Sequence, residues 1–359
     1  MTLAVNIAQI GSNNTTFRNR IINGAMVIDQ RNAGAVISSL GAVTTYIVDR
    51  FFYQSGNAGR FSAQQNAGTV TPPAGFTKYL GFTSLGANSP AASDYGIASQ
   101  AIEGLNITDL GWGTASAATI TISFWVRSSI TGTQSIALVN VASVRSYSQT
   151  YTINSANTWE QKTITVPGDT SGTWATDNTT GIYLRFPLAT GSSNLTTAGV
   201  WNATNSNGAT GTTAISATSG ATFYITGVQL EAGTTASPFE YRSYGTELAL
   251  CQRYYEIYSN GTGTSAIFEG LGGYFANSSI FRTAVPFKVT KRASPSVSVP
   301  ITYLTVNCLA GNLTPSGAGS NFSSPDGAAI NCYVSGATGG QGATLGISSS
   351  APVKISAEL

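Results

Sequence analysis

Apolar and polar residues alternate with a period of two along much of this chain, and Gly, Asn and Pro interrupt the alternation at short intervals. This pattern is typical of β-strands that bury one face and are joined by turns. The clearest strands are predicted over 119–128, 158–168, 181–191 and 221–233. No segment repeats at a fixed period, which argues against a β-helix or solenoid. The pattern therefore predicts an all-β protein that begins with a jelly-roll β-sandwich.

One segment, YGTELALCQRYYEIY over 244–258, departs from the alternation. Its apolar and tyrosine side chains recur at the spacing of one helical stripe, and Glu247 suits the first turn of a helix. The stripe consists of Leu250, Cys251, Tyr254, Tyr255 and Tyr258. A helix this short is marginal in water unless the stripe packs on something. The sequence predicts a helix over 244–258 that either joins two β-domains or closes the first core.

Alternation resumes after this segment. Phe281, Val285 and Val289 share one face of a predicted strand, and Arg282 and Lys288 share the other. This pattern predicts a second, smaller β-sandwich at the C-terminal end. We therefore predict an attachment arm over 1–17, a jelly roll over 18–243, a linker helix over 244–258 and a C-terminal β-domain over 259–359. In the arm, Leu3, Val5 and Ile7 alternate like a strand that pairs with another edge.

Composition limits the class of protein. Only 9% of the 359 residues are charged and the net charge is +2, which argues against capture of nucleic acid or an anionic membrane. A hydrophobic content of 42% and a mean hydropathy of +0.07 leave enough apolar surface for packed cores. We find neither a signal peptide nor a run long enough to insert in a membrane. A virion protein made in the host cytoplasm fits these observations.

The residue types also restrict the chemistry. The chain has no histidine, which excludes serine and cysteine triads and histidine-based zinc sites. The glycine-rich segment 336–346 lacks the Lys-Ser/Thr pair of a phosphate-binding loop. The three cysteines, Cys251, Cys308 and Cys332, are unclustered and are expected to be buried reduced thiols. We expect no enzyme activity and no cofactor.

One pair of carboxylates leaves alternatives open. Asp169 and Asp177 flank Trp174 in a predicted loop. Such a pair can make Asx-turns, can hold a structural calcium ion, or can hydrolyse a glycosidic bond. All three interpretations are compatible with the sequence.

Aromatic residues suggest where a ligand could bind. Trp174 and Trp201 lie in or beside Gly/Thr-rich segments, where an indole either packs in the core or stacks on a sugar ring. In the second domain Tyr274, Tyr303 and Phe322 are candidate stacking platforms. They accompany uncharged loops predicted over Ser259–Gly263, Leu309–Ser324 and Ser335–Gly346, which either contact sugar hydroxyls or are solvated connectors.

Several segments resemble bacteriophage structural proteins of the tail-fibre type. They are NRIINGAMVIDQRNAG (19–34), YIVDRFFYQ (46–54), NTWEQKTITVPGDTSGTW (157–174), TFYITGVQLEAGTTASPFEYRSYGTELALCQRYYE (222–256) and FRTAVPFKVTKRASPSV (281–297). The resemblance implies a jelly roll like that of carbohydrate-binding modules, a small C-terminal β-domain, and a homotrimeric fibre on the virion. We expect the trimer contact at the tyrosine-rich stripe, with Leu250, Tyr254, Tyr255 and Tyr258.

These observations favour a tail fibre that binds a host-surface glycan or protein, with the arm over 1–17 attached to other tail or baseplate proteins. One alternative is a head-decoration or adaptor protein of the virion. Another is a polysaccharide-degrading tailspike that would use Asp169 and Asp177.

Overall fold

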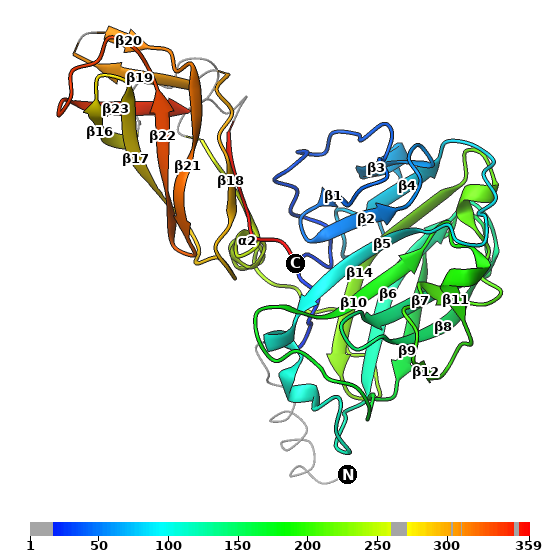
Figure 1. Cartoon of the computed structure of the whole chain (residues 1–359). Helices are drawn as coiled ribbons and strands as arrows, with labels where there is room; N and C mark the ends of the chain where they lie inside the picture. Colours follow the sequence, from blue (N-terminus) through cyan, green and yellow to red (C-terminus); the bar gives the residue numbers. More distant parts are fainter. Residues whose placement is uncertain (1–16, 260–270, 303, 310, 348–351) are drawn as a thin grey trace. The chain divides into compact units, whose positions relative to one another are not determined.

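The computed structural model describes residues 17–259, 271–302, 304–309, 311–347 and 352–359 (Figure 1). The chain divides into two compact units, Met1–Ser243 and Tyr244–Leu359, called here the first and second units. Apart from Phe17, the predicted attachment arm lies outside the described residues.

The first unit is a β-sandwich. One sheet has seven strands in the order β1-β2-β5-β10-β7-β8-β12, and the other has five in the order β3-β4-β14-β6-β9. The seven-stranded sheet consists of β1 Thr45–Val48, β2 Phe51–Ser55, β5 Gly96–Glu103, β10 Thr180–Pro187, β7 Gly132–Asn140, β8 Arg145–Ile153 and β12 Trp201–Asn202. The five-stranded sheet consists of β3 Phe61–Gln65, β4 Leu80–Ser84, β14 Thr222–Ala232, β6 Ile120–Ser128 and β9 Glu160–Val166.

Short elements connect these strands. Two residues each of β11 (Leu195–Thr196) and β13 (Gly208–Ala209) pair in parallel. The 3-10 turns are Ala67–Thr69, Gly104–Asn106, Thr108–Leu110, Ser192–Asn194 and Ile215–Ala217. β14 carries a bulge between Thr226 and Gln229, where Gly227 has a φ of 61°. A Cβ there would lie 2.6 Å from the Phe76 ring, so glycine meets both the backbone and the packing requirement.

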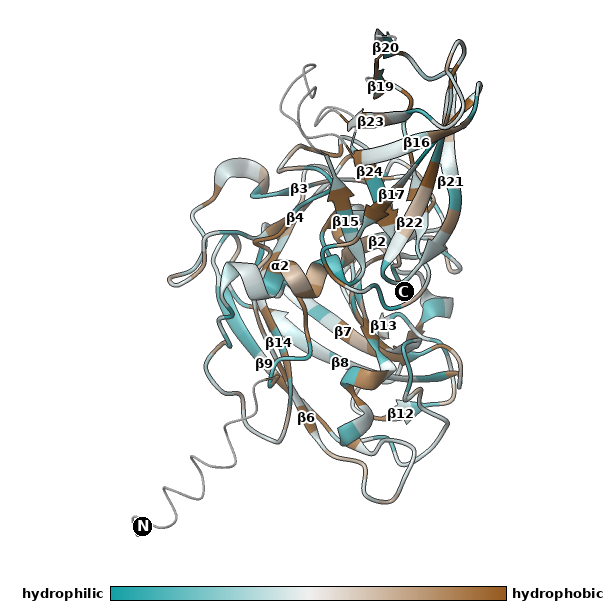
Figure 2. Ribbon diagram, turned by 90° about the vertical axis from the view of Figure 1, so that its left-hand side faces the viewer, coloured by the Kyte–Doolittle hydropathy of each residue, from teal (hydrophilic) through white to brown (hydrophobic). Residues whose placement is uncertain are grey.

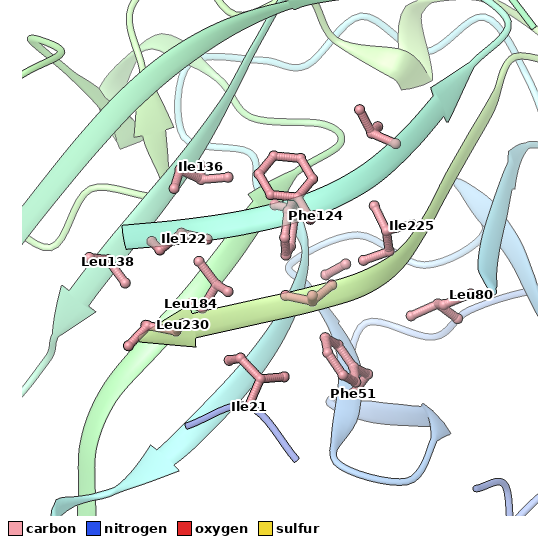
Figure 3. Packing of buried hydrophobic residues seen from close by; sticks show 14 of the residues in the cluster. Ile21, Phe51, Leu80, Ile122, Phe124, Ile136, Leu138, Leu184, Ile225 and Leu230 are labelled. Atoms are coloured by element: carbon pink, nitrogen blue, oxygen red, sulfur yellow. The ribbon is translucent and has the colours of Figure 1, made fainter. Parts of the chain in front are cut away.

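The apolar positions of the predicted strands form the core between the two sheets. Ile120, Ile122, Phe124 and Val126 of β6 are all fully buried in one cluster. Figure 3 shows side chains of β6 and β14 packed with others from the facing strands, among them Leu184. Along the ribbon the hydropathy changes from residue to residue within strands, as Figure 2 shows. The all-β sandwich predicted from the alternation is confirmed.

The second unit is also a sandwich of two sheets. Seven strands lie in the order β20-β19-β23-β16-β17-β22-β21, and three in the order β15-β24-β18. The larger sheet consists of β20 Gly311–Leu313, β19 Leu304–Cys308, β23 Gly342–Ile347, β16 Leu271–Asn277, β17 Ile280–Pro286, β22 Gly327–Tyr333 and β21 Gly317–Ser324. The smaller consists of β15 Tyr255–Tyr258, β24 Val353–Ser356 and β18 Ser296–Ser298. Side chains of both sheets, such as Phe281 and Ile355, share one core.

The predicted helix over 244–258 is wrong in its second half. The helix α2 spans Tyr244–Gln252, and Tyr255–Tyr258 is strand β15, paired antiparallel with β24. Tyrosine and isoleucine favour strands, and the periodicity of a short segment fits either structure. The strand partner lies about a hundred positions further along the chain, where local pattern cannot reveal it.

One predicted loop is largely wrong, and a second is wrong only at its end. Most of Leu309–Ser324 forms β20 and β21, and the end of Ser335–Gly346 belongs to β23. β21 is an edge strand in which no residue is fully buried. Its Gly, Ser and Asn residues therefore give no apolar alternation to indicate a strand. Of Ser259–Gly263, only Ser259 lies within the described residues.

No helix within the described ranges has the length and apolar character needed to cross a membrane.

Candidate functional site

Trp174, a predicted stacking platform, is buried in the first unit. It is 9% exposed, and its indole N–H donates a hydrogen bond to the Ser171 carbonyl at 3.0 Å. Its ring packs edge-on against Trp112 at a centroid distance of 4.8 Å. A stacking platform needs at least one ring face open to the ligand, and Trp174 is too buried for that, so this residue stabilises the loop instead.

Trp201 completes the same aromatic cluster. It lies on the two-residue strand β12 at the edge of the sheet and pairs with Tyr147. Its ring is half-buried, 5.4 Å from Trp112 and 5.7 Å from Trp174, and its N–H donates to the Pro167 carbonyl at 2.8 Å. Through the hydrogen bond to Pro167, the cluster of Trp112, Trp174 and Trp201 holds the segment that follows β9 against the edge of the sandwich.

The two candidate metal ligands have protein partners. Asp169 is 2% exposed and accepts two hydrogen bonds from Arg145, both at 2.7 Å. This bidentate pair raises the pKa of Arg145, chiefly through the hydrogen bond itself. Asp177 is exposed and accepts from the backbone and hydroxyl of Thr179, which lower its pKa. The described residues contain no group of three or more His, Cys, Asp or Glu side chains arranged around a metal position.

The four side chains predicted to form the trimer contact differ in their exposure to solvent. Tyr254 and Tyr255 are buried in the single chain, and Tyr258 is half-buried against the core of the second unit. Leu250 on α2 is also half-buried. The homotrimer stays a prediction, and its contact would rest on Leu250 and the exposed part of Tyr258.

In the second unit, Tyr274 occupies the outer face of the seven-stranded sheet. The residue is 52% exposed on β16, where its neighbours Gly273 and Phe275 point towards the core. Its partner on β23 is Gly342 and its partner on β17 is Arg282, which is exposed. Because Gly342 has no side chain, one side of the tyrosine ring is left open.

A second row of outward positions lies beside Tyr274. Asn307 on β19 pairs with Thr344 on β23, and Thr344 pairs with Gly272 on β16. Gly272 is exposed, and a Cβ added there would meet no atom within 4 Å. Because Gly272 has no side chain, a gap lies between the polar side chains of Asn307 and Thr344 and the ring of Tyr274.

This gap is part of an open pocket of about 490 Å³. Its lining consists of Gly272, Gly273, Asn307, Cys308, Leu309, Gly342, Ala343 and Thr344. None of these side chains is charged. Leu309 is 94% exposed at the rim, and Cys308 is half-buried rather than buried as predicted. The Cys308 thiol is directed to the Gly311 carbonyl at 3.2 Å.

Asn307 is the unusual residue of the pocket. Both polar atoms of its amide are shielded from solvent, and neither has a hydrogen-bond partner within the part of the chain that the structure describes. An unsatisfied buried polar group costs about 1–3 kcal/mol, so such groups call for an explanation. A ligand that offers both a donor and an acceptor would remove this cost once the amide turns towards the pocket.

Phe322 lies on the same outer face, towards the opposite edge of the sheet. It is 67% exposed on β21 and pairs with Ala329 of β22. Tyr274 and Phe322 are three strands apart, which corresponds to about 14 Å at the usual strand spacing. Only an extended ligand would contact both rings. Tyr303, the third predicted platform of this domain, lies outside the described residues.

Asn307 and Gly272 were not predicted as site residues from the sequence. Because side chains alternate between the two faces of a strand, Gly272 lies on the same face as Tyr274. By the same rule Asn307 points outward if its neighbour Val306 points inward. What the sequence does not contain is the pairing of β19, β23 and β16 that brings them together.

No protein-family model matches the chain, and no curated protein matches it. Among solved structures, the chain is similar to the enzymatically active domain of tailspike protein 4 from bacteriophage CBA120, with 12% identity and a TM-score of 0.31. That match covers 61% of this chain and 22% of the tailspike chain.

The chain is also similar to a family 11 carbohydrate-binding module from Clostridium thermocellum, with 15% identity and a TM-score of 0.28 over 54% of this chain and 97% of the module. The module TmCBM61, solved with β-1,4-galactotriose, shows 11% identity and a TM-score of 0.28 over 60% of this chain and 99% of the module. These similarities are too weak to indicate a function for this chain.

Proposed function

We propose that this chain is a non-enzymatic bacteriophage tail-fibre protein, and that the outer face of the seven-stranded sheet of the second unit binds an uncharged glycan of the host surface. The observation that carries the proposal is the pocket beside Tyr274, where the amide of Asn307 has no hydrogen-bond partner among the described residues. The tail-fibre resemblance of the sequence segments supports the virion role.

The chemistry of the pocket suits sugar hydroxyls. A primary amide offers two donors and one carbonyl acceptor, and a hydroxyl both donates and accepts. The hydroxyl of Thr344 and the open ring of Tyr274 add a polar contact and a stacking face. A lining without charged side chains favours a neutral ligand over an anionic one.

One such pocket gives weak adhesion. Several linked copies raise the overall affinity because later contacts form at high effective concentration. Homotrimer formation and attachment to the tail or baseplate through 1–17 are therefore part of the proposal. An array of such fibres would hold a particle on a glycan layer without a tight single site.

The test is an array of bacterial surface glycans probed with the labelled full chain. We expect neutral glycans to bind, and Gly272→Leu to reduce binding about tenfold or more because its side chain fills the pocket. Tyr274→Ala should also weaken binding. Leu85→Ala removes an exposed apolar side chain from the first unit and should bind like the wild type.

The proposal fails if no glycan binds, or if Gly272→Leu retains full binding to the glycans that the wild type recognises. Incubation of the chain with each bound polysaccharide, followed by an assay for new reducing ends, tests the non-enzymatic part. A rise in reducing ends would identify a tailspike-type hydrolase instead.

A further inference from the structure

Arg185 is a buried cation on the central strand of the seven-stranded sheet in the first unit. It lies on β10, on the outer face of the seven-stranded sheet, because its neighbours Leu184 and Phe186 point into the core. The residue is only 8% exposed. Its strand partners are Ser99 on β5 and Ala137 on β7.

The guanidinium of Arg185 has few partners. Its Nη1 donates to the Asn207 amide oxygen at 2.6 Å, and the guanidinium lies 5.0 Å from the centre of the Tyr183 ring. Its Nε is buried without an acceptor, and Nη2 makes no hydrogen bond with the described residues. No carboxylate of the described chain forms an ion pair with it.

Five other arginines of the first unit pair with carboxylates, whereas Arg185 has no such pair among the described residues. The five are Arg18, Arg20, Arg60, Arg145 and Arg242. Burial lowers the pKa of Arg185 to about 10, and the group remains charged at neutral pH. A buried charge without a counter-charge is unfavourable, so the fold maintains an arrangement that an added anion would stabilise.

Two hydroxyls lie in the same row of the sheet. The hydroxyls of Ser99 and Ser148 are buried without a partner in the part of the chain described by the structure. Ser99 is directly opposite Arg185, and Ser148 is opposite Ala137, which pairs with Arg185 on the other side. Three groups with unused hydrogen-bonding capacity therefore share one row.

Aromatic rings border this row. Phe52, the partner of Ser99 on β2, lies 6.4 Å from Tyr183 in an edge-on arrangement. Tyr183 and Tyr95 lie close enough to act on the guanidinium electrostatically, and both are half-buried rather than enclosed. A cation, hydroxyls and partly open rings are the groups expected around an acidic sugar.

We propose that Arg185 is the centre of a second binding site, which takes the carboxylate of an acidic sugar such as a uronic acid. The Nε and Nη2 donors form a planar fork that matches the two oxygens of one carboxylate, and binding requires the side chain to turn so that the buried Nε faces the ligand. One guanidinium balances a monoanion, whereas a phosphate group would retain net negative charge. This site is in a different unit from the neutral pocket and does not depend on it.

The test is titration calorimetry of the full chain with trigalacturonate, its methyl ester and inorganic phosphate. We expect only trigalacturonate to bind. Its methyl ester has the same sugar rings but no carboxylate charge, and phosphate has charge but no sugar ring. Arg185→Met should weaken this binding about tenfold or more. Arg127→Met is the matched control, because Arg127 also lies over a tyrosine ring but donates to the Asn157 carbonyl.

Thermal unfolding separates a ligand role from a structural one. If Arg185 serves the ligand, Arg185→Met removes an unpaired buried charge and leaves Tm unchanged or raises it. The proposal is overturned if trigalacturonate does not bind, if its ester or phosphate binds equally well, or if Arg185→Met lowers Tm and leaves binding unchanged.

Discussion

The pair formed by Glu256 and Lys291 allows a quantitative test of the second unit. Both side chains are completely buried, and Lys291 Nζ lies 2.6 Å from a Glu256 carboxylate oxygen. The ammonium also donates to the carbonyls of Gln252 at 2.6 Å and Val289 at 3.1 Å. The carboxylate accepts the backbone N–H of Lys288 as well, at 3.2 Å. The pair thus connects α2 and β15 to the segment that follows β17.

We predict that Glu256→Gln lowers the free energy of unfolding of the second unit by about 3–5 kcal/mol, because it leaves a buried ammonium without its counter-charge. The shape of the side chain is retained, so packing changes little. A double variant, Glu256→Met with Lys291→Met, removes both charges and should recover most of this loss.

The same variant should change the pH dependence of stability. Burial lowers the pKa of Lys291 below its ordinary value of 10.5, and Glu256 opposes this shift. Between the folded and unfolded pKa values the unfolded chain binds more protons, so stability rises with pH across that window. Removing Glu256 lowers the folded pKa further, and the window begins at a lower pH.

Urea unfolding, followed by far-ultraviolet circular dichroism at several pH values, measures these effects. A loss below about 1 kcal/mol in Glu256→Gln would refute the argument, because surface ion pairs contribute that little. A double variant no more stable than the single one would also contradict it.

Three further predictions follow from the same structure. Gly273→Ala should destabilise the second unit, because its Cβ would lie 2.1 Å from the Arg282 carbonyl oxygen, whereas Gly272→Ala should leave thermal unfolding unchanged. The pKa of Asp94 is lowered by the Ala91 N–H and then by Arg60, so this group stabilises the fold above about pH 4 and the contribution disappears below it. Asp94→Asn should therefore flatten an acid titration of Tm. Light scattering should give three times the 37.0 kDa chain mass, and a monomer at micromolar concentration would contradict the trimer.

The strands of the core could be predicted from the sequence because burial of one face requires apolar and polar residues to alternate. Ile122 and Phe124 of β6 alternate with polar residues, and the structure buries both. The alternation is absent where neither face is fully buried, as in β21. In segments as short as Tyr255–Tyr258 it cannot be distinguished from a helical spacing.

The candidate sites were only partly predictable. Tyr274 and Phe322 were recognisable as aromatic residues in polar surroundings, but tryptophans met the same criterion and Trp174 proved to be buried. Asn307 and Arg185 could be recognised only from strand pairing and from polar atoms that lack a partner among the described residues. Those properties arise from the tertiary structure and have no signature in local sequence.

The pocket beside Tyr274 is proposed to hold a host-surface glycan. The most direct measurement is the amount of labelled full chain that binds to bacteria carrying a glycan recognised on the array. Wild type and Leu85→Ala should give the same saturation curve, and Gly272→Leu should require about tenfold more protein or fail to bind. Gly272→Leu binding to the cells as well as the wild type, with unchanged thermal unfolding, would contradict the account.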